Sequence, residues 1–354
     1  MLSPPVLYRY SSLFFSLYPS AHSHTIKGSD QRCKSGKGAP SIMGKHQQAP
    51  AYMAAILYSF IIGLSFLFVK IALQTAEPFD ILAHRFTIAF AAATVPILFG
   101  WVKLSIRVKD VIAILPLALL YPALFFSFQA FGLVYSSSSE AGIIQAAIPI
   151  FTMVLASYLL KERSTWMQKG FTVLSVAGVM FIFVMKGVEV ESASLTGSML
   201  ILLSALSSAM YNTAARKMTQ RFKLIELTYI MSAIGFAAFN AIALVRHSAA
   251  GTVGTYFQPF REPGFVLAIV YLGVLSSLVT SFLSNYTLSR IEAFKMSAFN
   301  HVATIVTMIA GVVILNETLA WYHLAGAVCI MIGVVGSNIN VQKKTYHHRV
   351  PAKK

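Results

Sequence analysis

Polar and ionisable side chains that could do chemistry stand inside long apolar runs of this sequence. They are Lys70, Arg85, Glu140, Gln145, Tyr211, Asn212, Asn285, Asn300 and His301. Such groups are costly inside lipid, so each suggests solute binding or proton movement. The sequence offers no HExxH pair, GxSxG motif or phosphate-binding glycine loop, and we therefore expect no enzyme. No cofactor is expected, and two distant cysteines lack the spacing of a metal site.

Lys70 and Arg85 fall near the outer ends of the first two apolar segments. Long basic side chains can snorkel to the headgroups from such positions, so anchoring and packing compete with a role in a solute path. Glu140 follows the serine run 136–139 and is expected to open a helix, with Ser139 as the N-cap. A plain helix start competes there with binding a substrate amine or carrying a proton.

The composition of the chain predicts the kind of secondary structure that positions these residues. The 354 residues are 56% hydrophobic and only 11% charged, too few charges to wet the surface of a soluble domain. Apolar windows fall at about 51–69, 86–102, 111–133, 141–160, 166–185, 196–215, 227–245, 265–288, 296–315 and 320–340. A span needs roughly 20 apolar residues, and runs of this length favour helices over barrel strands. The sequence predicts an all-α polytopic membrane protein with ten transmembrane helices.

The formal charge of +16 is best explained by orientation in the membrane rather than by binding of nucleic acid. When loops are assigned alternately from an internal N-terminus, Lys and Arg gather in the inside set, as the positive-inside rule requires. Both termini are therefore expected in the cytoplasm, with the protein in the plasma membrane. Residues 1–50 read as a leader, with 1–42 suspected not to belong to the native chain, and 341–354 as a basic tail.

The two halves of the chain repeat each other at an offset of 155 residues. Glu162 falls on Glu317, Gly178 on Gly333, and Pro149 on a threonine. We expect two five-helix repeats, 51–190 and 195–340. Because five is odd, the second repeat is inverted relative to the first, as in secondary transporters that alternate access around a site between their repeats.

Glu162 and Glu317 each end the fourth helix of a repeat and are interpreted as structural markers. A carboxylate is disfavoured at a helix C-terminus, so we expect amides at the start of the following helix to hold it.

Gln145 and Asn300 are also repeat mates, and His301 adjoins Asn300. Inversion places Gln145 in the outer half of helix four and the other two in the inner half of helix nine. They are expected to lie along one polar path, where His301 could relay protons near neutral pH. In the competing interpretation, both side-chain amides only hold neighbouring helices together by hydrogen bonds. Tyr211, Asn212 and Asn285 are lesser candidates.

Four stretches carry a family resemblance: GLSFLFVKIAL (63–73), EPFDILAHRF (77–86), FQAFGLVYSSSSEAGIIQAAIPIFTMVLASYLLKER (128–163) and LNETLAWYHLAGAVCIMIGVVG (315–336). In order, spacing and duplication, the chain resembles an EamA-type member of the drug/metabolite transporter superfamily over about residues 50–340. The resemblance implies export or exchange of small polar or amphipathic metabolites, such as amino-acid-like solutes or drugs.

The alternatives are a nucleotide-sugar-type exchanger of the same superfamily and a non-transporting membrane sensor or scaffold. The expected partners are a small solute and membrane lipid. Proton coupling and a homodimer are left open. No part of the sequence reads as an ATP-binding domain, so transport would draw on a gradient.

Overall fold

The computed structural model describes residues 45–160, 165–185, 192–317 and 321–338. All regular structure in these ranges is helical, and eight of the helical stretches are long and apolar enough to cross a membrane, so the predicted all-α membrane fold is confirmed. The leader 1–42, Glu162 and the tail 341–354 lie outside the described residues.

In chain order the helices are α2 (Lys45–Leu73), α3 (Pro78–Leu98), α4 (Val108–Ala118), η1 (Leu119–Leu124), α5 (Phe125–Tyr135), α6 (Ser138–Gln145), α7 (Ile148–Leu159), α8 (Trp166–Met185), α9 (Ser192–Met218), α10 (Leu224–Ala250), η2 (Val253–Thr255), η3 (Gln258–Arg261), α11 (Pro263–Val270), η4 (Tyr271–Val279), α12 (Thr280–Arg290), α13 (Ala293–Ala298), α14 (Asn300–Leu315) and α15 (Trp321–Asn338). The elements η1 and η4 are π-helical, whereas η2 and η3 are short 3-10 turns.

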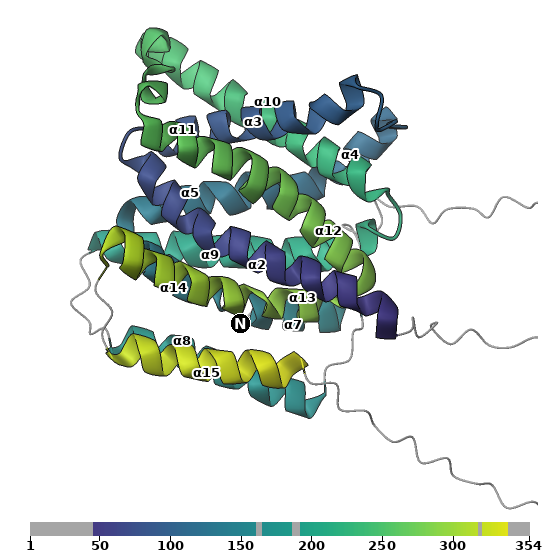
Figure 1. The fold of residues 1–354 in the computed structure, drawn as a ribbon, viewed down its shortest axis with the longest axis vertical. Helices are drawn as coiled ribbons and strands as arrows, with labels where there is room; N and C mark the ends of the chain where they lie inside the picture. Colours follow the sequence, from purple (N-terminus) through teal and green to yellow (C-terminus); the bar gives the residue numbers. More distant parts are fainter. Residues whose placement is uncertain (1–44, 161–164, 186–191, 318–320, 339–354) are drawn as a thin grey trace, which may run out of the picture.

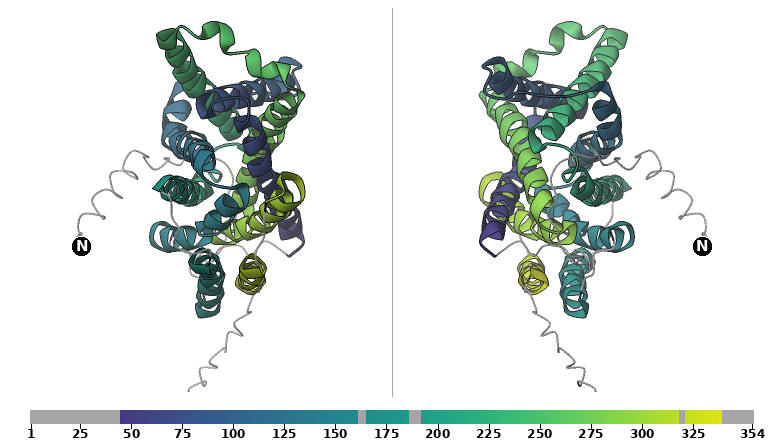
Figure 2. Two further views of the ribbon diagram at one scale, coloured as in Figure 1. Left: turned by 90° about the vertical axis from the view of Figure 1, so that its left-hand side faces the viewer. Right: turned by 90° about the vertical axis from the view of Figure 1, so that its right-hand side faces the viewer.

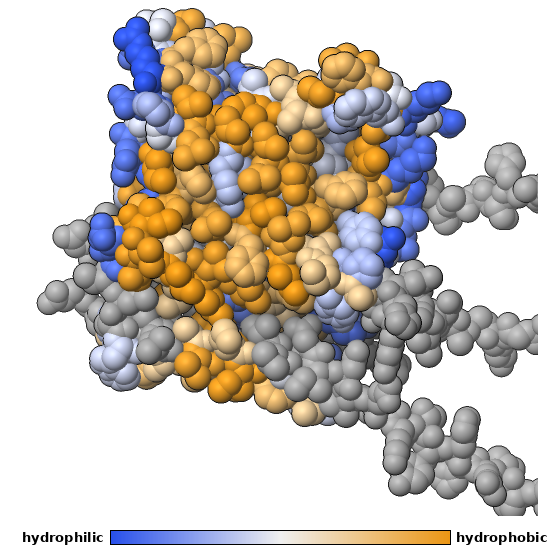
Figure 3. All heavy atoms as spheres, viewed as in Figure 1, coloured by the Kyte–Doolittle hydropathy of each residue, from blue (hydrophilic) through white to orange (hydrophobic). Residues whose placement is uncertain are grey.

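Eight helical stretches within the described ranges are long and apolar enough to cross a membrane. They are Ala49–Leu73, Pro78–Leu98, Val108–Tyr135, Ser138–Leu159, Leu195–Met218, Leu224–Ala250, Pro263–Arg290 and Ala293–Leu315. Two further helices, α8 and α15, have 20 and 18 residues. Apolar side chains cover the middle of the bundle, and hydrophilic ones gather at its left and right edges (Figure 3). Ten spans remain a prediction.

The second apolar segment begins earlier than the sequence predicted. We expected 86–102, but α3 runs from Pro78 to Leu98. Proline fits the first turn of a helix because the amide hydrogen it lacks has no partner there, and Asp80 is favoured at the same end. His84 and Arg85 consequently lie inside the helix and are buried.

Two predicted helices are broken. The segment predicted at 141–160 is divided into α6 and α7 at Ala146 and Ala147, and that at 296–315 into α13 and α14 at Phe299. The ring of Pro149 would clash with the carbonyl four residues earlier in a continuous helix, which explains the first break. At the second break, Asn300 Nδ2 donates to the carbonyl of Ser297, three residues earlier (2.9 Å). This side-chain bond competes with the backbone hydrogen bonds that would continue the helix.

The helices form a layered bundle in which α2 packs against α12 and α14, α3 against α10, and α5 against α9 (Figure 1). The pair α8 and α15 lies side by side at one end of the bundle and packs chiefly against itself (Figures 1 and 2). Three helix starts recur at the predicted offset of 155 residues: α11 after α4, α13 after α6 and α15 after α8. The first two helices of the halves are offset less, with α9 starting 147 residues after α2 and α10 starting 146 residues after α3. The π-helical elements η1 and η4 interrupt corresponding spans.

Candidate functional site

Arg85 is buried in the core of the bundle, with only 1% of its surface exposed. Its Nε donates to Ser277 Oγ (2.6 Å), and its Nη2 donates to Ser276 Oγ (2.9 Å) and to the Ser276 carbonyl (3.2 Å). The guanidinium carbon lies 3.8 Å from the centre of the Phe126 ring. The side chain does not snorkel to headgroups, because α3 begins two turns before it and turns it inward onto η4. Arg85 thus packs inside the bundle, and its role in a solute path stays a prediction.

The charge of Arg85 has no carboxylate partner in the part of the chain that the structure describes. Nη1 likewise has no hydrogen-bond acceptor among those residues. Gly273 allows this close approach of η4, since a Cβ there would lie 2.9 Å from the Arg85 carbonyl oxygen. A guanidinium presents donors in a fixed fork that matches a carboxylate. The geometry therefore suits recognition of an anionic group.

A second set of buried polar groups lies next to Arg85. Tyr211 Oη on α9 donates to Asn285 Oδ1 on α12 (2.8 Å), and Asn285 Nδ2 donates to Thr228 Oγ1 on α10 (3.2 Å). The Tyr121 ring on η1 stacks on Tyr211 at 4.7 Å and interacts electrostatically with Arg85. Two of the predicted residues, Tyr211 and Asn285, are thus in direct contact. Asn212 is buried on α9 as well.

We call Arg85, Tyr121, Tyr211, Asn285, Ser276 and Ser277 the central polar cluster. Three buried polar atoms on its elements, Tyr121 Oη, Ser281 Oγ and Ser284 Oγ, make no hydrogen bond of good geometry with a described residue, and neither does Gln129 Nε2 on the adjacent α5. Buried polar groups are normally paired, so unpaired ones favour a site that receives water or a ligand.

Tyr121, Ser276 and Ser277 escaped the sequence reasoning. Two signals could have found them, namely Pro122 inside an apolar span and the six Ser, Thr and Asn residues among the ten of 276–285.

Gln145, Asn300 and His301 are buried near the breaks of their helices. Gln145 Nε2 donates to Ser204 Oγ on α9 (3.0 Å). Asn300 Nδ2 donates to the Ser297 carbonyl, as described above, and His301 Nδ1 has no hydrogen-bond partner among the described residues. None of the three lines the cavity at the start of α3 or the cavity beside the end of α2. The polar path predicted through them stays a prediction.

Glu317, just past the end of α14, joins the N-terminus of α6. It accepts hydrogen bonds from the amides of Ser138 (2.9 Å) and Ser139 (3.1 Å) and from both hydroxyls. We expected amides of the following helix, and the structure shows those of a helix in the other half of the chain. Ser137, not Ser139, is the N-cap of α6, because Ser139 is engaged with Glu317. Burial alone would raise the pKa of Glu317, but these hydrogen bonds outweigh it and hold the pKa below its ordinary value.

Glu140 lies in the first turn of α6 and accepts a hydrogen bond from Ser198 Oγ on α9 (3.0 Å). Pro149 is buried in the first turn of α7. Gly178 on α8 and Gly333 on α15 lie where those two helices touch. Glu162, the repeat mate of Glu317, falls outside the described residues.

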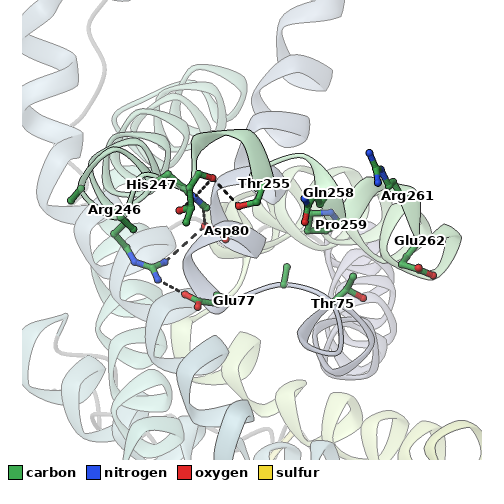
Figure 4. A pocket seen from close by; sticks show the side chains of 14 residues that line it. Thr75, Glu77, Asp80, Arg246, His247, Thr255, Gln258, Pro259, Arg261 and Glu262 are labelled. Carbon is green, nitrogen blue, oxygen red and sulfur yellow. Dashed lines mark hydrogen bonds and ion pairs between the residues drawn. The ribbon is translucent and has the colours of Figure 1, made fainter.

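A cavity of about 1000 Å³ opens where α3 begins and α10 ends (Figure 4). Ion pairs connect its walls. Arg246 contacts Glu77, and its Nη1 lies 3.9 Å from Asp80 Oδ1. His247 Nε2 lies 3.1 Å from the same Asp80 oxygen. A second cavity of about 450 Å³ lies beside the end of α2 and is lined by Lys70. Within the described ranges, no group of three His, Cys, Asp or Glu side chains could hold a metal ion.

Comparison with known proteins identifies the family to which the chain belongs. The model of the EamA-like transporter family matches residues 49–184 and 195–339. The chain is 91% identical over 312 residues to "Uncharacterized transporter YcxC" of Bacillus subtilis (strain 168), covering 88% of this chain and 100% of that protein. It is 24% identical to a "Probable amino-acid metabolite efflux pump" of Salmonella typhimurium, over 79% of this chain and 92% of that one. A solved crystal structure shares the fold with a TM-score of 0.60 at 15% identity, over 82% of this chain and 97% of the other.

Proposed function

The chain belongs to the EamA-like transporter family, and we propose that it is a secondary transporter that exports small amphipathic solutes of the amino-acid type across the plasma membrane. Membership of the family makes it a membrane-embedded, multi-pass transporter of small molecules. The proposal adds the solute class, the direction and a mechanism in which two inverted repeats alternate access to a site between them.

The observation that carries the proposal is the buried guanidinium of Arg85. A cation inside a span is costly, and it is retained where it serves a substrate or ion pathway. Hydroxyl and carbonyl groups hold Arg85 in place without neutralising it, so its charge is available for a solute carboxylate. Aromatic rings of Phe126 and Tyr121 adjoin it and suit the apolar part of an amphipathic solute.

The position of Arg85 also supports the proposal. The residues around it come from both halves of the chain: α3 and η1 from the first, and η4 and α12 from the second. Both π-helical interruptions contribute to the cluster, and discontinuous helices at the repeat interface are typical of transporter binding sites. Relatives in two bacteria carry the name "Probable amino-acid metabolite efflux pump".

The test measures efflux of radiolabelled L-leucine, with leucinamide, which lacks the carboxylate, as competitor. Arg85→Gln should lower leucine flux by about tenfold or more, because a charge-assisted hydrogen bond contributes about 1.5–3 kcal/mol. Arg85→Gln should also abolish the preference for leucine over leucinamide, which a merely unstable variant would not do. The exposed Arg221→Gln is the matched control and should transport normally.

Two results would count against the proposal. One is wild-type protein, reconstituted in vesicles, that moves no amino acid while exchanging nucleotides, which would favour the nucleotide-sugar exchanger. The other is an Arg85→Gln variant of normal abundance that still prefers leucine to leucinamide.

A further inference from the structure

Lys70 lines a cavity of about 450 Å³ at the outer end of α2. Its other polar lining residues are Gln74 and Glu77. The rest of the lining is apolar and comes from Leu73, Ala76, Pro78, Leu133, Val134 and Leu315. Ligand pockets range from about 300 to 1,000 Å³ and typically combine apolar walls with a few polar groups. This cavity has both properties.

The ammonium group of Lys70 is only partly exposed, yet it forms no ion pair or hydrogen bond with any residue that the structure describes. Glu317 and Glu140 attract it electrostatically from a distance. Neither approaches within 4.0 Å, because Glu317 is held by the N-terminus of α6 and Glu140 accepts from Ser198. The ammonium is therefore free to receive an anionic group inside the cavity.

The same cavity holds the opposite charge. Glu77 lines it and also lines the larger cavity of Figure 4, where its carboxylate contacts Arg246. Glu77 is two-thirds exposed, so this contact is a surface ion pair that costs little to exchange. A cation and an anion beside apolar walls match a zwitterion that carries an apolar side chain.

Lys70 lies nearer the outer surface than Arg85. It is three residues from the end of α2, or about 4.5 Å along the axis, whereas Arg85 is seven residues into α3, or about 10 Å. A turn of four residues, 74–77, joins these two helix ends. The two unpaired cations thus stand at successive depths in the outer half of one helical hairpin.

We propose that Lys70 binds the carboxylate of an outer solute site, occupied by zwitterionic amino acids with apolar side chains as they leave the central polar cluster. Glu77 receives the ammonium group, exchanging Arg246 for it, and the leucines around the cavity contact the side chain. This inference rests on the proposed function and adds a second solute-binding site to the transport path.

The experiment is counterflow of L-leucine in intact cells that express the protein. Release of preloaded radiolabelled leucine is measured against the concentration of external unlabelled leucine or leucinamide. Lys70→Gln should raise the half-saturating external leucine concentration about tenfold and remove the preference for leucine over leucinamide. The internal half-saturating concentration should stay within about twofold, because a charged hydrogen bond at the outer site adds nothing to binding from inside. Lys70→Arg should restore the external value.

Lys109→Gln, an exposed lysine at the start of α4, is the matched control and should behave as wild type. The inference is overturned, and the proposed function stands, if Lys70→Gln of normal membrane abundance keeps the wild-type external affinity and preference. If wild-type cells show no leucine counterflow above cells without the protein, the proposed function fails and the outer site fails with it.

Discussion

Two buried or half-buried charges in this protein have opposite surroundings. Glu317 accepts four hydrogen bonds from two serines at a helix N-terminus, where the helix dipole adds to the attraction. Arg85 donates three hydrogen bonds to neutral oxygens and meets no negative charge among the described residues. A fully satisfied charge stabilises a contact between elements, whereas an uncompensated one is available to a ligand. This contrast supports our proposals that Glu317 has a structural role and that Arg85 binds the solute.

Glu317→Gln should destabilise the protein near neutral pH by about 1–3 kcal/mol, since an amide nitrogen then faces donors that a carboxylate satisfied. The folded-state pKa of Glu317 is depressed below the ordinary value of 4.5, so its stabilisation is present above that pH and disappears as pH falls through the folded value. The stability difference between wild type and variant, measured by thermal unfolding in detergent, should therefore be constant from pH 7 to 5 and shrink below about 4.5.

Glu262→Gln, an exposed glutamate in the loop before α11, is the control and should leave stability unchanged. Equal unfolding midpoints for wild type and Glu317→Gln at pH 7 would contradict the structural role of Glu317.

At the scale of the elements, the sequence predicted which segments are helices but not how they are interrupted. Apolar length decides where a span lies, and it can be read directly from the residues. The breaks at Ala146 and Phe299 depend on a proline ring and on a side chain that bonds its own backbone. The early start of α3 escaped a search for uncharged windows, because Arg85 is charged yet buried against η4. The central polar cluster could not be predicted for the same reason, since packing between distant segments creates it.

The pair α8 and α15 provides a test at this scale. Gly333 lies where a Cβ would clash with Ser175 Oγ and come within 2.6 Å of the Phe171 carbonyl oxygen. Gly333→Ala should therefore separate the two helices or displace Ser175, at a cost of about 1–3 kcal/mol. Gly170→Ala on α8 meets nothing within 4 Å and is the control, which should be neutral or slightly stabilising. Thermal unfolding in detergent measures both, and equal midpoints would contradict the close packing.

At the scale of the whole molecule, two independent regularities lead to one topology. Three pairs of helix starts lie 155 residues apart, which supports the predicted division of the chain into two comparable halves. The distribution of Lys and Arg divides the loops into two sides. If each half has five spans, as we predict, equivalent loops face opposite sides of the membrane, and the cluster at Arg85 lies between two oppositely oriented units that can rock against each other.

The loops between α3 and α4 and between α10 and α11 occupy equivalent places in the two halves, so their sidedness tests the inversion directly. Two spans precede Ser105 and, counting α8, seven precede Gly254; both residues are exposed. From an internal N-terminus, an even number of spans leads to the inside and an odd number to the outside. In a chain whose two cysteines are replaced by serine, a membrane-impermeant maleimide added to intact cells should label Gly254→Cys and leave Ser105→Cys unlabelled until the membrane is opened. Labelling of both from the same side would mean that the halves are parallel, and the alternating mechanism proposed for Arg85 would lose its geometric basis.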